Sequence, residues 1–172
     1  RLAVKAAIEH NGPVYLRFGR MAVPVVNGDD YKFEIGRGVK LADGCDVALI
    51  ATGIEVEQAL LARDILAAEG IKASVINIHT IKPLDRAIIK KAAAETGAIV
   101  VAEEHSIIGG LGSAVAECVS ETCPCPVLRV GVQDTFGRSG KVPPLLELYG
   151  LTSEAIFVKA ETALRMKQAM KG

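Results

Sequence analysis

The strongest constraint on the fold is a repeated alternation between short, continuous apolar runs and longer segments of helical pattern. In chain order, the pattern predicts strands at 46–51, 74–79, 98–103 and 127–132, with helices at 54–69, 83–96, 110–120 and 153–171. Strands that stay apolar throughout are typical of a parallel sheet covered on both faces, with right-handed crossovers. We therefore expect an α/β fold, a three-layer α/β/α sandwich around a mostly parallel sheet of about five strands.

A further strand is expected just before the first of these apolar runs. Val39 and Leu41 alternate with Lys40, and Asp43-Gly44 separates them from the run at 46–51. A DG dipeptide between two strand-like runs predicts a β-hairpin. This additional strand should therefore be antiparallel and lie at an edge of the sheet.

Local signals also mark where the helices should begin and end. Thr52 and Glu55 have the spacing of a capping box, and Pro83 suits a first helical turn. Helices are expected to stop at three glycines, Gly70, Gly97 and Gly150.

The first 36 residues differ from this regular pattern. Residues 2–10 predict an amphipathic helix and 14–18 a short strand, whereas 21–36 begin with an aperiodic mixture of Pro, Asn, Gly and Asp. We expect 1–20 to be the end of an incomplete domain, 21–36 a linker and 37–172 a compact domain. Because the chain starts at Arg1 inside a helical pattern, we expect it to work as one part of a larger enzyme.

Composition argues against several classes of function. Twenty Lys and Arg residues balance twenty Asp and Glu residues, so we expect neither nucleic-acid binding nor a polybasic membrane anchor. The sequence shows no pattern of a signal peptide or of a membrane-spanning run. The four cysteines follow no disulfide framework, which favours a reducing cytosol. Cys123 and Cys125, with Cys118 upstream, hint at a metal clip, but free thiols at a helix end are the preferred interpretation.

Two glycine-containing segments mimic phosphate loops. The loop Gly109 to Gly112 opens a predicted helix, but Val115 replaces the third glycine of a dinucleotide fingerprint. In the segment Gly137 to Lys141 the glycine spacing is wrong, and Val142 replaces the hydroxyl residue that would hold magnesium. The turn at 52–57 carries two carboxylates, which would repel a phosphate. A small-molecule binding module that uses the first loop remains an alternative.

Few side chains are candidates for chemistry. The cluster Glu103-Glu104-His105 could serve acid–base catalysis, or its members could cap the next helix or face another domain. His79 ends a predicted strand and is interpreted as a packed or interface residue. Arg17 and Arg20 could clamp a phosphate or a carboxylate with their planar guanidinium groups, or form surface ion pairs.

With these residues in view, the chain resembles the C-terminal part of a transketolase, and it fits the separate C-terminal subunit of a split enzyme. The resemblance covers nearly the whole chain. It rests on the following segments in order: Thr80-Ile81-Lys82-Pro83-Leu84-Asp85, Glu103-Glu104-His105, Gly109 to Val115, Arg138-Ser139-Gly140-Lys141 and Leu145 to Leu151.

The resemblance implies a cytoplasmic enzyme of the pentose phosphate pathway that transfers a two-carbon ketol unit between sugar phosphates. Such an enzyme uses thiamine diphosphate and a divalent metal such as Mg²⁺. Residues 1–20 would then end the pyrimidine-binding domain, and 37–172 would form the C-terminal domain. This part would hold no cofactor and no catalytic residue, and it would be inactive alone. Its partner would be a thiamine-binding N-terminal domain or subunit, in a dimer, another homo-oligomer or a heterotetramer.

One functional position carries over from the family. An arginine in the segment Leu16 to Arg20 binds the sugar phosphate in transketolases, and alignment on the residue before the linker selects Arg20 over Arg17. The glycine-rich stretch is also similar to that of deoxyxylulose-phosphate synthase, which stays open as an alternative. The segment Arg138 to Lys141 resembles transketolase more closely.

Overall fold

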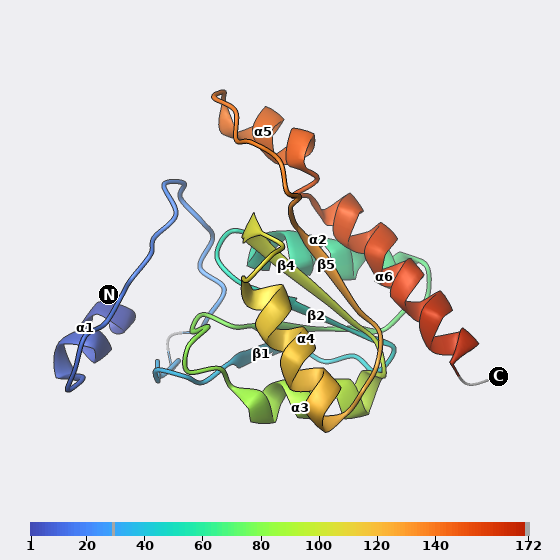
Figure 1. Ribbon diagram of the computed structural model, residues 1–172, viewed down its shortest axis with the longest axis horizontal. Coiled ribbons are helices and arrows are strands. Elements are labelled where there is room, and N and C mark those ends of the chain that lie inside the picture. Colours follow the sequence, from blue (N-terminus) through green and yellow to red (C-terminus); the bar gives the residue numbers. More distant parts are fainter. Residues whose placement is uncertain (29, 171–172) are drawn as a thin grey trace.

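The computed structural model describes residues 1–28 and 30–170. Its centre is a five-stranded sheet with the order β1-β3-β2-β4-β5 (Figure 1). All neighbouring pairs are parallel except β1, which is antiparallel to β3 at the edge. The predicted sheet type is therefore confirmed. The strands are β1 (Val39–Ala42), β2 (Val47–Ala51), β3 (Ala73–Asn77), β4 (Ile99–Ser106) and β5 (Val127–Val132).

Four helices cover the two faces of the sheet, as predicted for a three-layer sandwich. The helices α2 (Glu55–Ala68) and α6 (Ser153–Ala169) lie on one face, and α3 (Arg86–Thr96) and α4 (Leu111–Thr122) lie on the other. Two shorter helices, α1 (Leu2–Glu9) and α5 (Val142–Tyr149), stand outside these layers in Figure 1. The sequence pattern set no bounds for α5, although a helix was expected to stop at Gly150; α5 carries prolines in its first turn.

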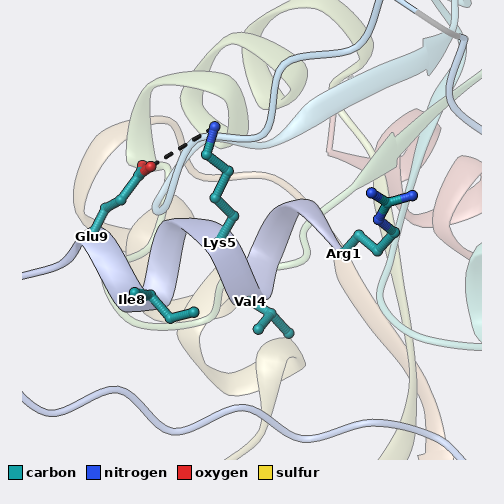
Figure 2. A pocket seen from close by; sticks show the side chains of 5 residues that line it. All are labelled: Arg1, Val4, Lys5, Ile8 and Glu9. Carbon is teal, nitrogen blue, oxygen red and sulfur yellow. Dashed lines mark ion pairs between the residues drawn. The ribbon is translucent and has the colours of Figure 1, made fainter.

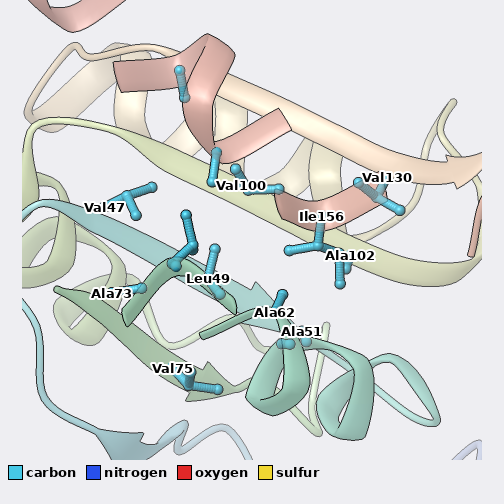
Figure 3. Packing of buried hydrophobic residues seen from close by; sticks show 14 of the residues in the cluster. Val47, Leu49, Ala51, Ala62, Ala73, Val75, Val100, Ala102, Val130 and Ile156 are labelled. Atoms are coloured by element: carbon cyan, nitrogen blue, oxygen red, sulfur yellow. The ribbon is translucent and has the colours of Figure 1, made fainter. Parts of the chain in front are cut away.

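Alternating side chains of each strand build the two halves of the core. Leu49 and Val100 point toward α2 and α6, as Figure 3 shows, whereas Ile50 and Val101 pack toward α3 and α4. Every residue of β2 is buried, because it is a central strand covered on both faces. Burying one such aliphatic side chain contributes roughly 1.5–3 kcal/mol, which explains why the strands are apolar without alternation.

The predicted hairpin between β1 and β2 is wrong. Strand β1 pairs with β3, with Val39 opposite Asn77. The chain then crosses the start of β3 so closely that a Cβ on Gly44 would overlap the backbone of Ala73 and Ser74. Gly44 is therefore needed because the chain passes close to the backbone of β3, and Asp43-Gly44 does not form a two-residue hairpin turn.

Helix ends were predicted with mixed success. Gly97 and Gly150 occupy left-handed conformations directly after α3 and α5, as expected for helix stops. Helix α3, however, begins at Arg86 instead of Pro83, because the Asp85 side chain accepts a hydrogen bond from the Ile88 N–H at 3.1 Å and caps it. The predicted linker residue 29 and the predicted helix end at 171 lie outside the described residues.

The first 28 residues add little to the core. Helix α1 contains no buried residue, and the predicted strand at 14–18 is absent from this fully described stretch. A strand needs a neighbouring strand for its backbone hydrogen bonds, and none lies beside this segment in Figure 1. Among the described residues, no helix is long and apolar enough to cross a membrane.

Candidate functional site

The best candidate site lies where the neighbouring strands β2 and β4 end. The chain leaves β2 toward β3 on one side and leaves β4 toward β5 on the other, which is the arrangement where open α/β sheets bind ligands. The Thr52 N–H donates to the Ala102 carbonyl at 3.2 Å and holds the two strand ends together. We call residues 52–55 and 103–105 the carboxyl edge.

Glu103 is the best-anchored side chain of the carboxyl edge. It is 2% exposed, and its two carboxylate oxygens accept hydrogen bonds from the N–H groups of Leu111 and Gly112, both at 2.7 Å. These N–H groups belong to the first turn of α4, where a negative charge is favourable. The interpretation of the Glu103-Glu104-His105 cluster as helix-capping is therefore correct for Glu103.

The Glu103 carboxylate also explains the glycine-rich loop. A Cβ on Gly110 would overlap this carboxylate, so the loop needs glycine to bring the helix start close to the strand end. The donors that a bound phosphate would use are occupied by a side chain of the protein itself. This arrangement argues against the alternative of a small-molecule site at Gly109 to Gly112.

Glu104 and His105 do not join Glu103 in one catalytic cluster. Side chains alternate along a strand, so Glu103 continues the α4 face of the sheet and Glu104 the α2 face. His105 is exposed, and its Nδ1 lies 3.1 Å from the carbonyl oxygen of Ser106. The three side chains are adjacent in sequence but lie in different surroundings.

Glu55 is the most unusual group at the carboxyl edge. It is the first residue of α2 and is 0% exposed, yet neither carboxyl oxygen has a hydrogen-bond partner among the described residues. Burial raises the pKa of Glu55 to about 7, and the nearby charge of Glu104 adds to the shift. The capping box predicted from Thr52 and Glu55 is wrong, because Ile54 occupies the N-cap position and no side chain caps this helix.

The structure brings one of the two predicted arginines to the carboxyl edge. Arg17 Nη1 donates to the Glu104 carbonyl oxygen at 3.4 Å. Two residues later, a Cβ on Gly19 would lie 3.8 Å from Cγ2 of Ile54. Arg20 follows on the same segment and is exposed.

His79 is packed, as predicted, at the end of β3. Its ring lies 4.4 Å from that of Phe33, between centroids, and its Nδ1 is 2.9 Å from Oγ1 of Thr80. Partial burial lowers the pKa of this imidazole. The contact joins the predicted linker to the domain, and no sequence signal singled out Phe33 as its partner.

Three of the four cysteines are buried or half-buried thiols, whereas Cys45 is exposed. Cys118 is buried, with its sulfur 3.9 Å from the Arg86 carbonyl oxygen, and burial raises the pKa of Cys125 to about 11. Across the described part of the chain, no group of three or more His, Cys, Asp or Glu side chains is placed to hold a metal ion.

The carboxyl edge also does not fit thiamine diphosphate. At the carboxyl edge the first N–H groups of α4 are taken by Glu103, and the start of α2 carries the buried carboxyl of Glu55. Both features disfavour a diphosphate there.

The N-terminal residues expose apolar side chains on more than one face. On α1, Val4 and Ile8 are 42% and 80% exposed, and Figure 2 shows them on the side of the helix away from the Lys5–Glu9 ion pair (3.9 Å). Several larger side chains between residues 14 and 25 are exposed as well. These exposed apolar side chains lie outside both hydrophobic cores of the domain.

Residues 36–156 match the family model described as the C-terminal domain of transketolase. The chain belongs to this family. The resemblance inferred from the sequence motifs is thereby confirmed, and the mostly parallel sheet with one antiparallel strand is the fold of the transketolase C-terminal domain.

Similar proteins include a transketolase subunit and a deoxyxylulose-phosphate synthase. The chain is 44% identical over 167 residues to the 6-deoxy-6-sulfo-D-fructose transketolase subunit SqwH of Clostridium sp. (strain MSTE9), covering 97% of this chain and 52% of the relative. It is 42% identical over 156 residues to the 1-deoxy-D-xylulose-5-phosphate synthase of Heliobacterium modesticaldum (strain ATCC 51547 / Ice1), covering 89% and 24%.

A solved structure is more similar still. It is described as a split gene transketolase in an inactive β4 tetramer, and it matches with a TM-score of 0.93 and 50% identity over 96% of this chain and 55% of its own. The chain thus spans about half the length of the transketolase subunit and of this solved chain, and about a quarter of the synthase.

Proposed function

We propose that the chain is the C-terminal part of a thiamine-diphosphate-dependent transketolase, which transfers a ketol unit between sugar phosphates. Its task in that enzyme is association between domains and subunits, and it contributes no catalytic group of its own. Residues 1–20 end the pyrimidine-binding domain, 21–36 are the linker and 37–172 are the C-terminal domain. The cofactor and its divalent metal belong to the remaining domains of the complete, cytoplasmic enzyme.

The observation that carries this proposal is the exposed apolar surface of the N-terminal residues. Tyr15, Phe18 and Val25 are 87%, 67% and 93% exposed, although the body of the domain has a full core of its own. Such side chains are stabilised only when another surface covers them. The remainder of a pyrimidine-binding domain is the covering surface that the family predicts.

The proposed partner is a thiamine-binding N-terminal domain or subunit, within a homo-oligomer or a heterotetramer. The names of the relatives support it, because one is called a transketolase subunit and another a split gene transketolase that forms a β4 tetramer.

Arg20 is the residue that we propose for binding the phosphate of the sugar substrate. A guanidinium group binds a phosphate dianion through two parallel hydrogen bonds. Of the two candidate arginines, Arg20 is the more suitable because Arg17 is directed to the Glu104 carbonyl.

Reconstitution tests this function. We expect the chain to bind the thiamine-binding polypeptide in a pull-down, and the mixture to transfer ketol units between sugar phosphates while the chain alone does not. Arg20→Ala in the reconstituted enzyme should raise KM for phosphorylated substrates with a smaller effect on kcat. No association would contradict the partner, and unchanged saturation by ribose 5-phosphate would contradict the role of Arg20.

The second candidate is the corresponding part of a deoxyxylulose-phosphate synthase, which the 42% identity to such an enzyme supports. The same reconstituted mixture distinguishes the two functions. Formation of 1-deoxy-D-xylulose 5-phosphate without ketol transfer would favour the synthase.

A further inference from the structure

The last residues of the predicted linker lie against the segment that joins β3 to α3. We call residues 33–38 the strap, and they lead directly into β1. At the start of the strap, the Phe33 ring lies 4.4 Å from the His79 ring, between centroids. Phe33 and His79 are both half-buried, whereas Glu34 is exposed. The strap thus presents an aromatic side chain to the domain and a charged one to the solvent.

Two glycines let the strap approach the domain closely. A Cβ on Gly36 would lie 3.0 Å from Cγ of Pro83, and Gly36 has a φ of +82°, a conformation that favours glycine. A Cβ on Gly38 would lie only 2.6 Å from Cδ1 of Ile78, so that side chain would have to move. The backbone of the strap is therefore in direct contact with the domain.

Asp85 joins the strap to the start of α3. Its side chain is largely buried; Oδ1 accepts a hydrogen bond from the Ile88 N–H at 3.1 Å, and Oδ2 accepts one from the Gly38 N–H at 2.9 Å. Capping the helix needs only the first of these bonds, and Ser, Thr or Asn would provide it as well. The second oxygen distinguishes an aspartate at this position, and its partner belongs to the strap.

We propose that Asp85 is a positioning residue that fastens the strap, so that the chain leaves the domain in one fixed direction and not through a flexible linker. A carboxylate is a stronger acceptor than a neutral oxygen, which favours the bond to the Gly38 N–H. At the other end of the strap, the contact between the Phe33 and His79 rings buries apolar surface. The strap is held at both of its ends.

The strap has a consequence for Arg20, and this consequence rests on the proposed function. Upstream of the strap, Val26 packs against the core on the side of α2 and α6. The segment that carries Arg20 therefore precedes two points at which the chain contacts the domain. A guanidinium group that is positioned in advance binds a phosphate with a smaller ordering cost. Asp85 thus acts on substrate binding through Arg20, without contacting the substrate.

Amide hydrogen exchange, resolved by NMR in the intact polypeptide, tests the strap without any substrate. Asp85→Ser keeps one oxygen to cap α3 but lacks the second oxygen for the strap, whereas Asp85→Ala removes both bonds. In Asp85→Ser the Gly38 N–H should exchange about tenfold faster than in the wild type, and the Ile88 N–H should keep its protection. In Asp85→Ala both N–H groups should exchange faster.

Phe33→Ala tests the other end of the strap. Lys32→Ala is its matched control, because Lys32 is the neighbouring residue and is exposed. Within the strap, the Arg37 N–H donates to the Glu34 carbonyl oxygen at 3.2 Å, so its exchange reports on the same segment as that of Gly38. Phe33→Ala should speed the exchange of both N–H groups severalfold, and Lys32→Ala should leave it unchanged.

Two results would overturn the proposal. One is a Gly38 N–H that exchanges in the wild type as fast as in an unstructured peptide, which would mean that the strap is free. The other is an equal rise in exchange at Gly38 and at the N–H groups of β2 in Asp85→Ser, which would show a general loss of stability instead of a released strap.

Kinetics of the reconstituted enzyme measure the consequence for Arg20. Asp85→Ser should raise KM for ribose 5-phosphate severalfold with little change in kcat, because the substitution alters only the placement of the phosphate-binding residue. An unchanged KM would contradict the link between the strap and Arg20. A mixture that transfers no ketol units even with the wild-type chain would contradict the proposed function alone, and the exchange results would stand.

Discussion

Two strand-to-helix turns lie side by side at the carboxyl edge, and each buries one glutamate in a different way. In the turn from β4 to α4, Glu103 is 2% exposed and both of its oxygens accept backbone hydrogen bonds at 2.7 Å. In the turn from β2 to α2, Glu55 is 0% exposed and has no hydrogen-bond partner among the described residues. Equal burial of the same residue type thus has opposite energetic consequences.

Burial alone does not determine whether a carboxyl group is charged or neutral in the folded protein. The Glu103 carboxylate completes a helix start, so its charge is stabilised where it lies. The Glu55 carboxyl lacks donors and faces the Glu104 charge, so burial favours its neutral form. The first glutamate stabilises the folded domain as a carboxylate, whereas the second lies in surroundings that favour its neutral form.

The largest change in the free energy of unfolding is expected from removing the hydrogen-bonded side chain of Glu103. Glu103→Ala leaves the N–H groups of Leu111 and Gly112 buried without partners, which should lower the free energy of unfolding by about 3–5 kcal/mol. Urea denaturation at fixed protein concentration measures the loss. The neighbouring half-buried Glu104 is the control, and Glu104→Ala should change stability by less than about 1 kcal/mol. Similar losses in both variants would remove the distinction between the two faces of β4.

Replacing Glu55, which has no hydrogen-bond partner among the described residues, should instead raise the free energy of unfolding at neutral and higher pH. The pKa of Glu55 is about 7 in the folded protein against an ordinary 4.5, so the folded state keeps a proton that the unfolded chain releases between these values. Stability is therefore lost as pH rises from 4.5 to about 7, by roughly 3 kcal/mol at most.

Glu55→Gln abolishes this titration. The variant should match the wild type near pH 4.5 and exceed its unfolding free energy by about 2–3 kcal/mol at pH 8. Urea denaturation across this pH range provides the measurement. A difference between variant and wild type that does not depend on pH would contradict the assignment of the titration to Glu55.

A smaller loss is expected from crowding the satisfied carboxylate. In Gly110→Ala the new methyl group overlaps Glu103, so either the carboxylate or the loop must move, at a cost of about 2 kcal/mol. Gly137 is a suitable control because no atom lies within 4 Å of a Cβ placed on it. Gly137→Ala should therefore unfold at the same urea concentration as the wild type, and an equal effect of both substitutions would contradict a close approach at Gly110.

Much of the fold could be predicted from sequence because the governing forces are local and periodic. A continuous apolar run indicates a strand that is covered on both faces, and a glycine after a helical pattern indicates the end of the helix, as after α3 and α5. The partner of β1 could not be predicted, since the Asp43-Gly44 signal for a hairpin is indistinguishable from the close crossing over Ala73 that the structure uses.

The candidate site was less predictable, because its chemistry depends on contacts between distant segments. For Glu103, capping of the next helix was one of three alternatives that the sequence left open, and its specific partners depend on how α4 docks against β4. Glu55 matches the spacing of a capping box, but in the structure it is a buried acid without a hydrogen-bond partner among the described residues, and its pKa depends on burial and on the Glu104 charge. Local spacing contains no information on either neighbour.

The smallest expected effect separates a helix cap that forms from one that only matches in spacing. Thr152 accepts a hydrogen bond from the Ala155 N–H at 3.3 Å at the start of α6, whereas Thr52 makes no such bond at the start of α2. Thr152→Ala should therefore lower the unfolding free energy by about 1 kcal/mol and Thr52→Ala by a few tenths. Paired urea curves can resolve this difference. If Thr52→Ala cost as much as Thr152→Ala, the Thr52 side chain would cap the start of α2, contrary to the structure.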